Sequence, residues 1–381
     1  PSRLPSSLPT TPPSFQPSAS PSFHPSQNPS LEPSRLPSSF PTAQPSKLPS
    51  SKPSASPSLE PSSIPSLTSS TSPSENPSVL PSGTPSAMPT YADCGMSVED
   101  RRNRMTDTLL TVSDPSVLLT PGTPQFNARN WLLELDTFKS CPQDTLFVQR
   151  YVLAVFYFST RGDSWRQCNA PSDFSDTIEI EQANSDCTIM SNGYDPHRVS
   201  TIQGLDAWLS SSHECSWGGL ACDSTTSRVD RIEFENNGLA GTLPFELQEL
   251  TDLRFLIAEE GRTTGSIPSE YGTLSNLIVM DLNYNHLTGV LPEEIYRMSN
   301  LAQLDLNDNF LSGTISSSIG EFQDLRLLQI DKNLFSGTIP DTIGLLEKLE
   351  ILDMFGNLFE GAMPNSICQN RDIQGGSITD L

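Results

Sequence analysis

The sequence predicts an α/β repeat fold: a solenoid of stacked coils, preceded by a mostly helical region and by a disordered stalk. Leucines recur every 24 residues in the C-terminal part, apolar residues with helical spacing precede them, and a proline tetrad fills the N-terminal part. A chain of 381 residues is also too long for one compact core, so separate structural units are expected.

Residues 1–90 are expected to form the stalk. Proline occupies every fourth position from Pro1 to Pro89 except at Ser69, and Ser or Thr follows each of these prolines. Because proline fixes φ and lacks an amide hydrogen, neither a helix nor a sheet can propagate through this repeat. The segment should be extended and solvated. Its composition is typical of O-glycosylated stalks, and an unmodified disordered spacer is the alternative.

Residues 91–228 are expected to form a globular, mostly helical region. Ser97 followed by Asp100, and Thr123 followed by Pro124, are typical of helix starts. The second of these helices should place Trp131, Leu135 and Phe138 on one apolar face. Residues 144–158, DTLFVQRYVLAVFYF, are apolar nearly all round and predict a buried helix. The acidic stretch 169–200 is interpreted as a loop insertion.

The tripeptide Arg161-Gly162-Asp163 follows the buried helix and admits two interpretations. As a cell-adhesion ligand it would need an exposed, flexible loop. As a turn it uses Gly162 at a helix C-terminus and Asp163 as the cap of the next turn. We favour the structural turn.

Residues 229–372 are expected to form six coils of 24 residues with the pattern L-x-x-L-x-L-x-x-N-x-L-x-G-x-I-P. L-x-L is a short strand whose leucines point into the core. The pattern's asparagine can turn inward and bond backbone groups of the turns; it stands at Asn237, Asn285, Asn309, Asn333 and Asn357. No coil can bury its own apolar edge, so stability comes from stacking. Residues 373–381 are interpreted as the start of a truncated C-terminal cap.

These residues resemble the plant-type extracellular leucine-rich-repeat proteins, which include receptor ectodomains and polygalacturonase inhibitors. The element L-x-G-x-I-P marks that subtype, and ECSWGGLACD at 214–223 is similar to the Cys-x-Trp motif of its N-terminal cap. The resemblance implies a right-handed leucine-rich-repeat solenoid with a helical, disulfide-bonded cap, extracellular or at the cell surface. The Pro-Ser tetrads joined to this cap resemble predicted surface proteins of diatoms.

The chain departs from the family pattern at several positions. Gly261 and Thr263 stand where Asn and Leu belong in the second repeat, and Ser316 replaces Pro in the fourth. No usable N-glycosylation sequon is present, because proline follows Asn28 and Asn76. Extracellular relatives usually carry several sequons.

The seven cysteines lack the C-x-x-C spacing of a zinc site, so no metal is expected. The resemblance implies a disulfide between Cys215 and Cys222. A second pair, Cys168 with Cys187, would enclose the acidic stretch, and Cys94 with Cys141 follows only by elimination. Cys368 is expected to pair within the missing C-terminal cap. Free buried thiols of an intracellular protein are the alternative.

Catalysis, a cofactor and nucleic-acid binding are not expected. The four histidines, at 24, 197, 213 and 286, do not pair in sequence with a nucleophile or a metal ligand. Residues 1–90 hold four basic and three acidic residues, so the other 291 residues carry 18 basic and 42 acidic ones, a net charge of −24. Such a surface repels phosphate backbones.

The outward strand positions, on the concave face of the solenoid, are the expected ligand-binding site. They carry nine acidic residues against two basic ones, which favours a basic, partly apolar peptide; a glycan is a second candidate. Asp281 and Asp305 should be neighbours that point to solvent. The alternative is that the acids only keep the face soluble. The candidate ligand-binding residues are Phe255, Val279, Asp281, Tyr284, Asp305, Asp308, Leu327 and Asp353.

The function expected is extracellular or cell-surface recognition of a protein, peptide or glycan. One alternative is structural adhesion in a wall or matrix. Another is the ectodomain of a receptor with signalling and membrane parts beyond the present C-terminus. The longest apolar run, Tyr151–Phe158, is too short to span a bilayer, so membrane association would depend on that missing part.

Removal of residues 1–90 should leave the melting temperature of the remaining chain unchanged. A solvated polyproline-like segment shares no core with the rest and so contributes nothing to its unfolding free energy. Differential scanning calorimetry of the two chains is the measurement. A fall of several degrees on truncation would show that the boundary is wrongly placed.

Overall fold

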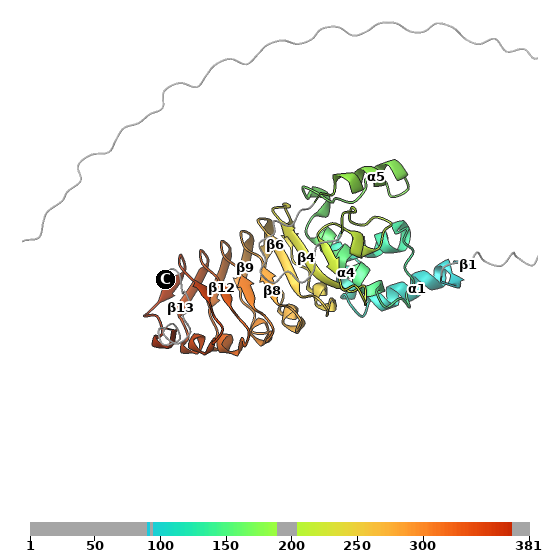
Figure 1. Cartoon of the computed structure of the whole chain (residues 1–381). Helices are drawn as coiled ribbons and strands as arrows, with labels where there is room; N and C mark the ends of the chain where they lie inside the picture. Colours follow the sequence, from blue (N-terminus) through green and yellow to red (C-terminus); the bar gives the residue numbers. More distant parts are fainter. Residues whose placement is uncertain (1–89, 92–93, 189–203, 368–381) are drawn as a thin grey trace, which may run out of the picture. The chain divides into compact units, whose positions relative to one another are not determined.

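The structure, a computed structural model, describes residues 90–91, 94–188 and 204–367 (Figure 1). The chain divides into two units, Pro1–Ser78 and Val79–Leu381. The stalk, His197, Cys368 and residues 373–381 lie outside the described residues, so the structure does not test the expectations for them. All that follows concerns the second unit.

The N-terminal region of the second unit is mostly helical. Strand β1 (Thr90–Tyr91) pairs with β2 (Met96–Ser97), and helices α1 (Val98–Leu109), α2 (Pro115–Leu118) and α3 (Pro124–Asn130) follow. Ser97 and Thr123 cap α1 and α3 as expected, since their side chains accept from the amides of Asp100 and Phe126. The remaining helices are the π-helix η1 (Trp131–Leu135), α4 (Phe147–Ser159), the 3₁₀ helices η2 (Gly162–Ser164) and η3 (Glu214–Ser216), and α5 (Thr177–Asp186).

Helix α4 forms the centre of this region. Every side chain from Tyr151 to Tyr157 is buried, as its apolar sequence predicted. At its N-terminal end the buried Arg150 forms ion pairs with Asp136 (2.8 Å) and Glu214 (3.2 Å). The guanidinium also lies 4.8 Å from the ring centre of Trp217. A buried charge is tolerated when it is paired and hydrogen-bonded, so Arg150 holds the helix to two distant segments.

Two expectations for this region are wrong. The stretch 169–200 is not only a loop, because α5 occupies Thr177–Asp186. Trp131, Leu135 and Phe138 do not share a buried helix face, because the helix becomes a π-helix at Trp131 and ends at Leu135. Leu135 and Phe138 are 47% and 41% exposed, whereas Trp131 is buried.

The Arg161-Gly162-Asp163 tripeptide forms a structural turn. The roles within it differ from expectation: Arg161, not Gly162, takes the left-handed conformation, with φ of 56°, and Asp163 lies inside η2 instead of capping it. A Cβ on Gly162 would lie 2.1 Å from the Tyr157 ring, so only glycine fits there. The Tyr157 hydroxyl donates a hydrogen bond to Asp163 (2.8 Å), which ties the turn back to α4.

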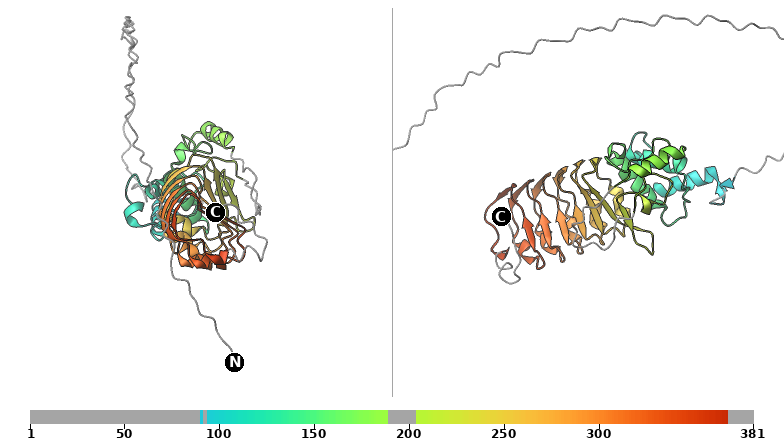
Figure 2. Two further views of the ribbon diagram at one scale, coloured as in Figure 1. Left: turned by 90° about the vertical axis from the view of Figure 1, so that its left-hand side faces the viewer. Right: turned by 45° about the horizontal axis from the view of Figure 1, so that its top comes forward.

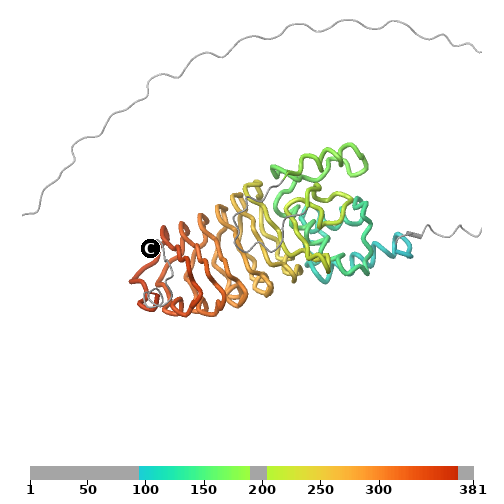
Figure 3. The backbone as a smooth tube through the Cα atoms, in the orientation of Figure 1, coloured from blue at the N-terminus to red at the C-terminus, as the bar shows by residue number. Residues whose placement is uncertain are grey.

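The leucine-rich-repeat solenoid is confirmed, and its coils stack in a row (Figures 2 and 3). Each coil places one strand in a seven-stranded sheet ordered β14-β12-β10-β8-β6-β4-β3, parallel except for β3 (Leu220–Cys222). The parallel strands are β4 (Val229–Glu235), β6 (Phe255–Glu259), β8 (Val279–Asp281), β10 (Gln303–Asp305), β12 (Leu327–Gln329) and β14 (Ile351–Asp353). Residues 24 apart are register partners, for example Asp281 and Asp305.

After the turn that ends its first strand, each coil adds one strand to a second sheet. This sheet has six strands in the order β15-β13-β11-β9-β7-β5. Its strands are β5 (Ala240–Thr242), β7 (Arg262–Gly265), β9 (His286–Val290), β11 (Phe310–Thr314), β13 (Leu334–Thr338) and β15 (Leu358–Glu360). Short 3₁₀ helices complete the coils: η4 (Phe245–Glu249), η5 (Ser269–Thr273), η6 (Ile295–Arg297), η7 (Ser317–Glu321) and η8 (Asp341–Leu345).

The buried asparagines connect one coil to the next. The Asn309 side chain accepts from the amide of Leu287 (2.9 Å) and donates to the carbonyl of Leu282 (3.0 Å), both in the preceding coil. Asn285, Asn333 and Asn357 make the equivalent bonds. Asn237 has no preceding coil and instead bonds the backbone of Gln167 in the N-terminal region.

The second coil explains why Gly261 replaces this asparagine. A Cβ at Gly261 would lie 2.9 Å from the carbonyl oxygen of Leu239, which is too close for any side chain. The neighbouring Arg262 amide bonds that carbonyl directly at 2.6 Å. At this position the two coils therefore meet through their backbones, without the asparagine bridge of the other coils.

Replacing Asn309 with Ala should lower the free energy of unfolding by about 2–4 kcal/mol, because it leaves several buried backbone groups without partners. The matched control is Asn300→Ala, since Asn300 is exposed and makes one bond, to Ser275 (2.7 Å). That change should cost less than about 1 kcal/mol. Urea unfolding measures both, and equal losses would contradict the role given to Asn309.

Candidate functional site

The candidate ligand-binding surface is the outward face of the seven-stranded sheet, which we call the strand face. Parallel pairing places residues 24 apart side by side on neighbouring strands. The face therefore consists of columns, and each column holds one residue from each coil. Of the eight candidate residues, Phe255, Val279, Asp281 and Asp305 are buried, Asp308, Leu327 and Asp353 are half-buried, and Tyr284 is exposed.

In the first coils, packed side chains cover the strand face and shield it from solvent. Phe255, Ile257 and Val279 form a small apolar cluster there. The buried Arg231 guanidinium lies 3.8 Å above the Phe255 ring and forms an ion pair with Glu233 (2.8 Å). These residues therefore stabilise the sheet.

Asp281 and Asp305 do not point to open solvent, contrary to expectation. They are only 8% and 5% exposed. Each accepts a bond from the amide two residues on, Asn283 (3.3 Å) and Asn307 (3.2 Å). Lysine at both positions would place two ammonium groups in a buried site, so that double change would disrupt folding.

Three neighbouring carboxyl groups of the strand face, Glu259, Asp281 and Asp305, have raised pKa values. Burial, with repulsion from nearby carboxylates, raises the pKa of Asp281 and Asp305 above the ordinary range. Burial and the nearby Glu235 raise the pKa of Glu259 to about 7. The buried amide oxygens of Asn283 and Asn307 lack a donor among the described residues. Protonated carboxyl groups can supply such donors.

A cluster of exposed and half-buried side chains lies at the edge of the strand face, and we call it the rim cluster: Tyr284, Asp308, Lys332 and Phe355. The Lys332 ammonium pairs with Asp308 (2.6 Å) and lies 5.7 Å from the ring centres of both aromatic residues. Tyr284 and Phe355 are 48% and 45% exposed. Four successive coils thus present two aromatic rings around one ion pair.

A left-handed turn displays three of these side chains. Tyr284, Asp308 and Lys332 have φ values of 48°, 50° and 49°. Each precedes the buried asparagine of its coil, so the chain must reverse there. This conformation costs a residue with a Cβ about 1 kcal/mol or more. The sequence pattern indicated Tyr284 and Asp308 as candidates but missed Lys332 and Phe355, whose grouping depends on how the coils stack.

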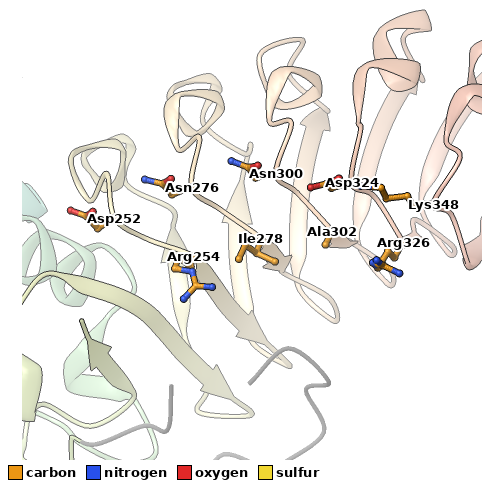
Figure 4. A pocket seen from close by; sticks show the side chains of 9 residues that line it. All are labelled: Asp252, Arg254, Asn276, Ile278, Asn300, Ala302, Asp324, Arg326 and Lys348. Atoms are coloured by element: carbon orange, nitrogen blue, oxygen red, sulfur yellow. Dashed lines mark hydrogen bonds and ion pairs between the residues drawn. The ribbon is translucent and has the colours of Figure 1, made fainter. Parts of the chain in front are cut away.

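A groove of about 480 Å³ runs along the flank of the coils, just before the strands (Figure 4). Most of its charged side chains are paired: Asp252 with Arg228, Asp324 with Lys348, and Arg326 with Glu350. The guanidinium of Arg254, which also lines the groove, lies 5.5 Å from the ring centre of Phe255. Its middle is uncharged and holds Asn276, Ile278, Asn300 and Ala302. None of its described lining residues is aromatic, so the groove is a weaker candidate than the rim cluster.

Three disulfides lie in the N-terminal region: Cys94–Cys141, Cys168–Cys187 and Cys215–Cys222. Within the described ranges, no group of three or more His, Cys, Asp or Glu side chains is arranged to hold a metal ion. None of the helices in the described part is long and apolar enough to cross a membrane.

The comparisons with known proteins agree with the coil geometry. The Leucine Rich Repeat family model matches residues 276–298 and 300–322. No curated protein matches the chain. The coil geometry and this family match thus define a leucine-rich-repeat protein. Solved structures of plant receptor ectodomains are similar to it at about 30% identity.

Three solved structures illustrate this similarity. The HAESA ectodomain of Arabidopsis, in complex with a peptide hormone ligand, is 34% identical over 44% of this chain and 28% of its own, with a TM-score of 0.41. PEPR1 with AtPEP1 is 32% identical over 41% and 22%, with a TM-score of 0.40. SOBIR1 of Arabidopsis thaliana is 29% identical over 41% and 89%, with a TM-score of 0.38. The chain therefore spans about a fifth of PEPR1.

The melting temperature should fall as pH rises from about 4 to 8. Glu259, Asp281 and Asp305 have raised pKa values in the folded chain, so it binds more protons than the unfolded chain does. Proton binding by these three groups stabilises the folded chain fully below the ordinary carboxyl pKa of about 4. This stabilisation is lost as the pH rises through the pKa values of the folded chain, near 7 for Glu259.

The double substitution Asp281→Asn and Asp305→Asn should flatten this dependence and raise the melting temperature at pH 8. Scanning calorimetry across the pH range measures it. Asp252→Asn on the flank is the matched control and should leave the dependence unchanged. An unaltered slope in the double variant would contradict the buried-carboxyl interpretation.

Proposed function

We propose that the protein is an extracellular or cell-surface recognition module that binds a protein or peptide through the rim cluster of its strand face. The rim cluster is the observation that carries this proposal. Exposed aromatic rings beside a charged pair are the side chains that dominate binding energy at protein interfaces. The proposed function is non-catalytic.

The chemistry of the cluster indicates what the ligand should offer. An apolar or aromatic side chain of the ligand would pack on Tyr284 and Phe355, and a charged group would exchange with the Asp308–Lys332 pair, which is part-exposed. The exposed Glu260 lies toward the first coils and favours a ligand with a basic end.

The location is supported by the three disulfides, which form and persist in oxidising compartments. We extend the proposal to residues 1–90, which would hold the solenoid away from a surface, as their resemblance to predicted diatom surface proteins implies. Two other functions would give different experimental results. Salt-resistant retention of the protein in a wall fraction would favour matrix adhesion. A membrane-spanning segment encoded in a longer reading frame would favour a receptor ectodomain.

Peptides that bind the wild-type protein can be selected from a displayed random library. Their affinity for the variants Tyr284→Gly and Phe355→Ala should be at least about tenfold weaker than for the wild-type protein, which is equivalent to about 1.4 kcal/mol. Glycine at 284 suits the positive φ, so this variant should fold with little change in stability. Leu345→Ala is the control, because Leu345 is 63% exposed in η8, outside the strand face. Selected peptides that bind both rim variants normally would overturn the proposal.

A further inference from the structure

A pocket of about 610 Å³ lies in the N-terminal region, and none of its lining residues belongs to either solenoid sheet. Its volume falls within the range of about 300–1,000 Å³ that small-molecule sites occupy. We propose that this pocket binds a neutral sugar unit of a glycan. The site is separate from the strand face and does not depend on its ligand.

The interior of the pocket is apolar and firmly held. Trp131, Tyr157 and Leu209 are 1%, 0% and 2% exposed and line its inner part. The half-buried Phe158 and Phe174 also line it and keep part of their rings accessible. Aromatic faces carry negative charge density, which attracts the weakly positive C–H groups of a sugar ring.

The π-helix η1 contributes two residues of this lining. Its closing bond runs from the Asp136 amide to the Trp131 carbonyl (2.8 Å), so the turn holds one residue more than an α-helical turn. Trp131 and Leu135 both line the pocket, Trp131 buried and Leu135 47% exposed. Single π-turns are rare and are frequent at functional sites.

Side-chain amides provide most of the polar lining: Asn127, Asn130 and Asn169. The NH₂ group of Asn169 donates to the carbonyls of Gly162 and Trp165, and the side-chain oxygen of Asn130 accepts from Arg129. The Asn169 oxygen and the Asn130 NH₂ group are therefore available to a ligand. No hydrogen bond of the Asn127 side chain is found among the described residues. Amides both donate and accept, as sugar hydroxyls require.

The charge of the described lining residues disfavours an anionic ligand. Among them there is no Lys, Arg or His, so they offer an anion no countercharge. Asp163 is the one carboxylate among the described lining residues, and one of its oxygens already accepts from the Tyr157 hydroxyl (2.8 Å). Its second oxygen can accept from a hydroxyl group of the ligand. A purely apolar ligand would leave the amides without partners, so a ring with both C–H faces and hydroxyl groups fits best.

Isothermal titration of the whole chain with neutral and acidic oligosaccharides tests the proposal. The neutral probes are the trisaccharides of β-1,3-glucan, β-1,4-glucan, chitin and mannan, and the acidic probe is trigalacturonate. At least one neutral trisaccharide should bind one to one, with a dissociation constant of about 1 mM or tighter, and the acidic one should not bind.

Asn127→Ala and Phe174→Ala should each weaken that binding by at least about fivefold and leave the melting temperature within a few degrees. Tyr284→Gly should leave it unchanged, which separates this site from the strand face. The proposal is overturned if no neutral sugar binds the folded protein, if indole binds and sugars do not, or if sugar affinity falls with Tyr284→Gly and not with the two pocket variants.

Discussion

Each coil of the solenoid leaves turn backbone groups inside the molecule that only a neighbouring coil can satisfy, and the rest of the structure depends on how this is done. Asn285, Asn309, Asn333 and Asn357 supply the missing bonds between coils. Where the asparagine is absent, Gly261 lets two backbones meet directly. Because these bonds fix the register, they also determine which residues stand in line on the strand face.

The first coil satisfies the same requirement through the N-terminal region. Asn237 bonds Gln167, and the Ala240 amide donates to the carbonyl of Thr160 at the end of α4 (3.0 Å). Buried Glu246 accepts from Ser113 and Gln125, which adds a third connection. The helical region therefore ends the coil stack where a further coil would otherwise be needed, and the turn at Arg161–Asp163 belongs to this junction.

The sequence allowed the 24-residue coil period, the inward asparagines, the capped helices and the buried helix α4 to be predicted, because each follows from local periodicity or capping chemistry. How deeply each side chain is buried could not be predicted from the sequence. Period 24 showed that Asp281 and Asp305 face outward from the core, yet they are covered on that side. Helix α5 was missed because none of its residues is buried, so it lacks an apolar stripe. The pocket of the N-terminal region joins segments that have no common sequence pattern.

The left-handed turn has a consequence for how such chains diversify. Its residue lies outside the core and outside the asparagine bonds, so a change of side chain there leaves the coil intact. Duplication of a coil adds one more such residue, displaced by about the strand spacing of 4.8 Å. The length of the exposed edge and its chemistry can therefore evolve separately: the first with the number of coils, the second with one residue in each.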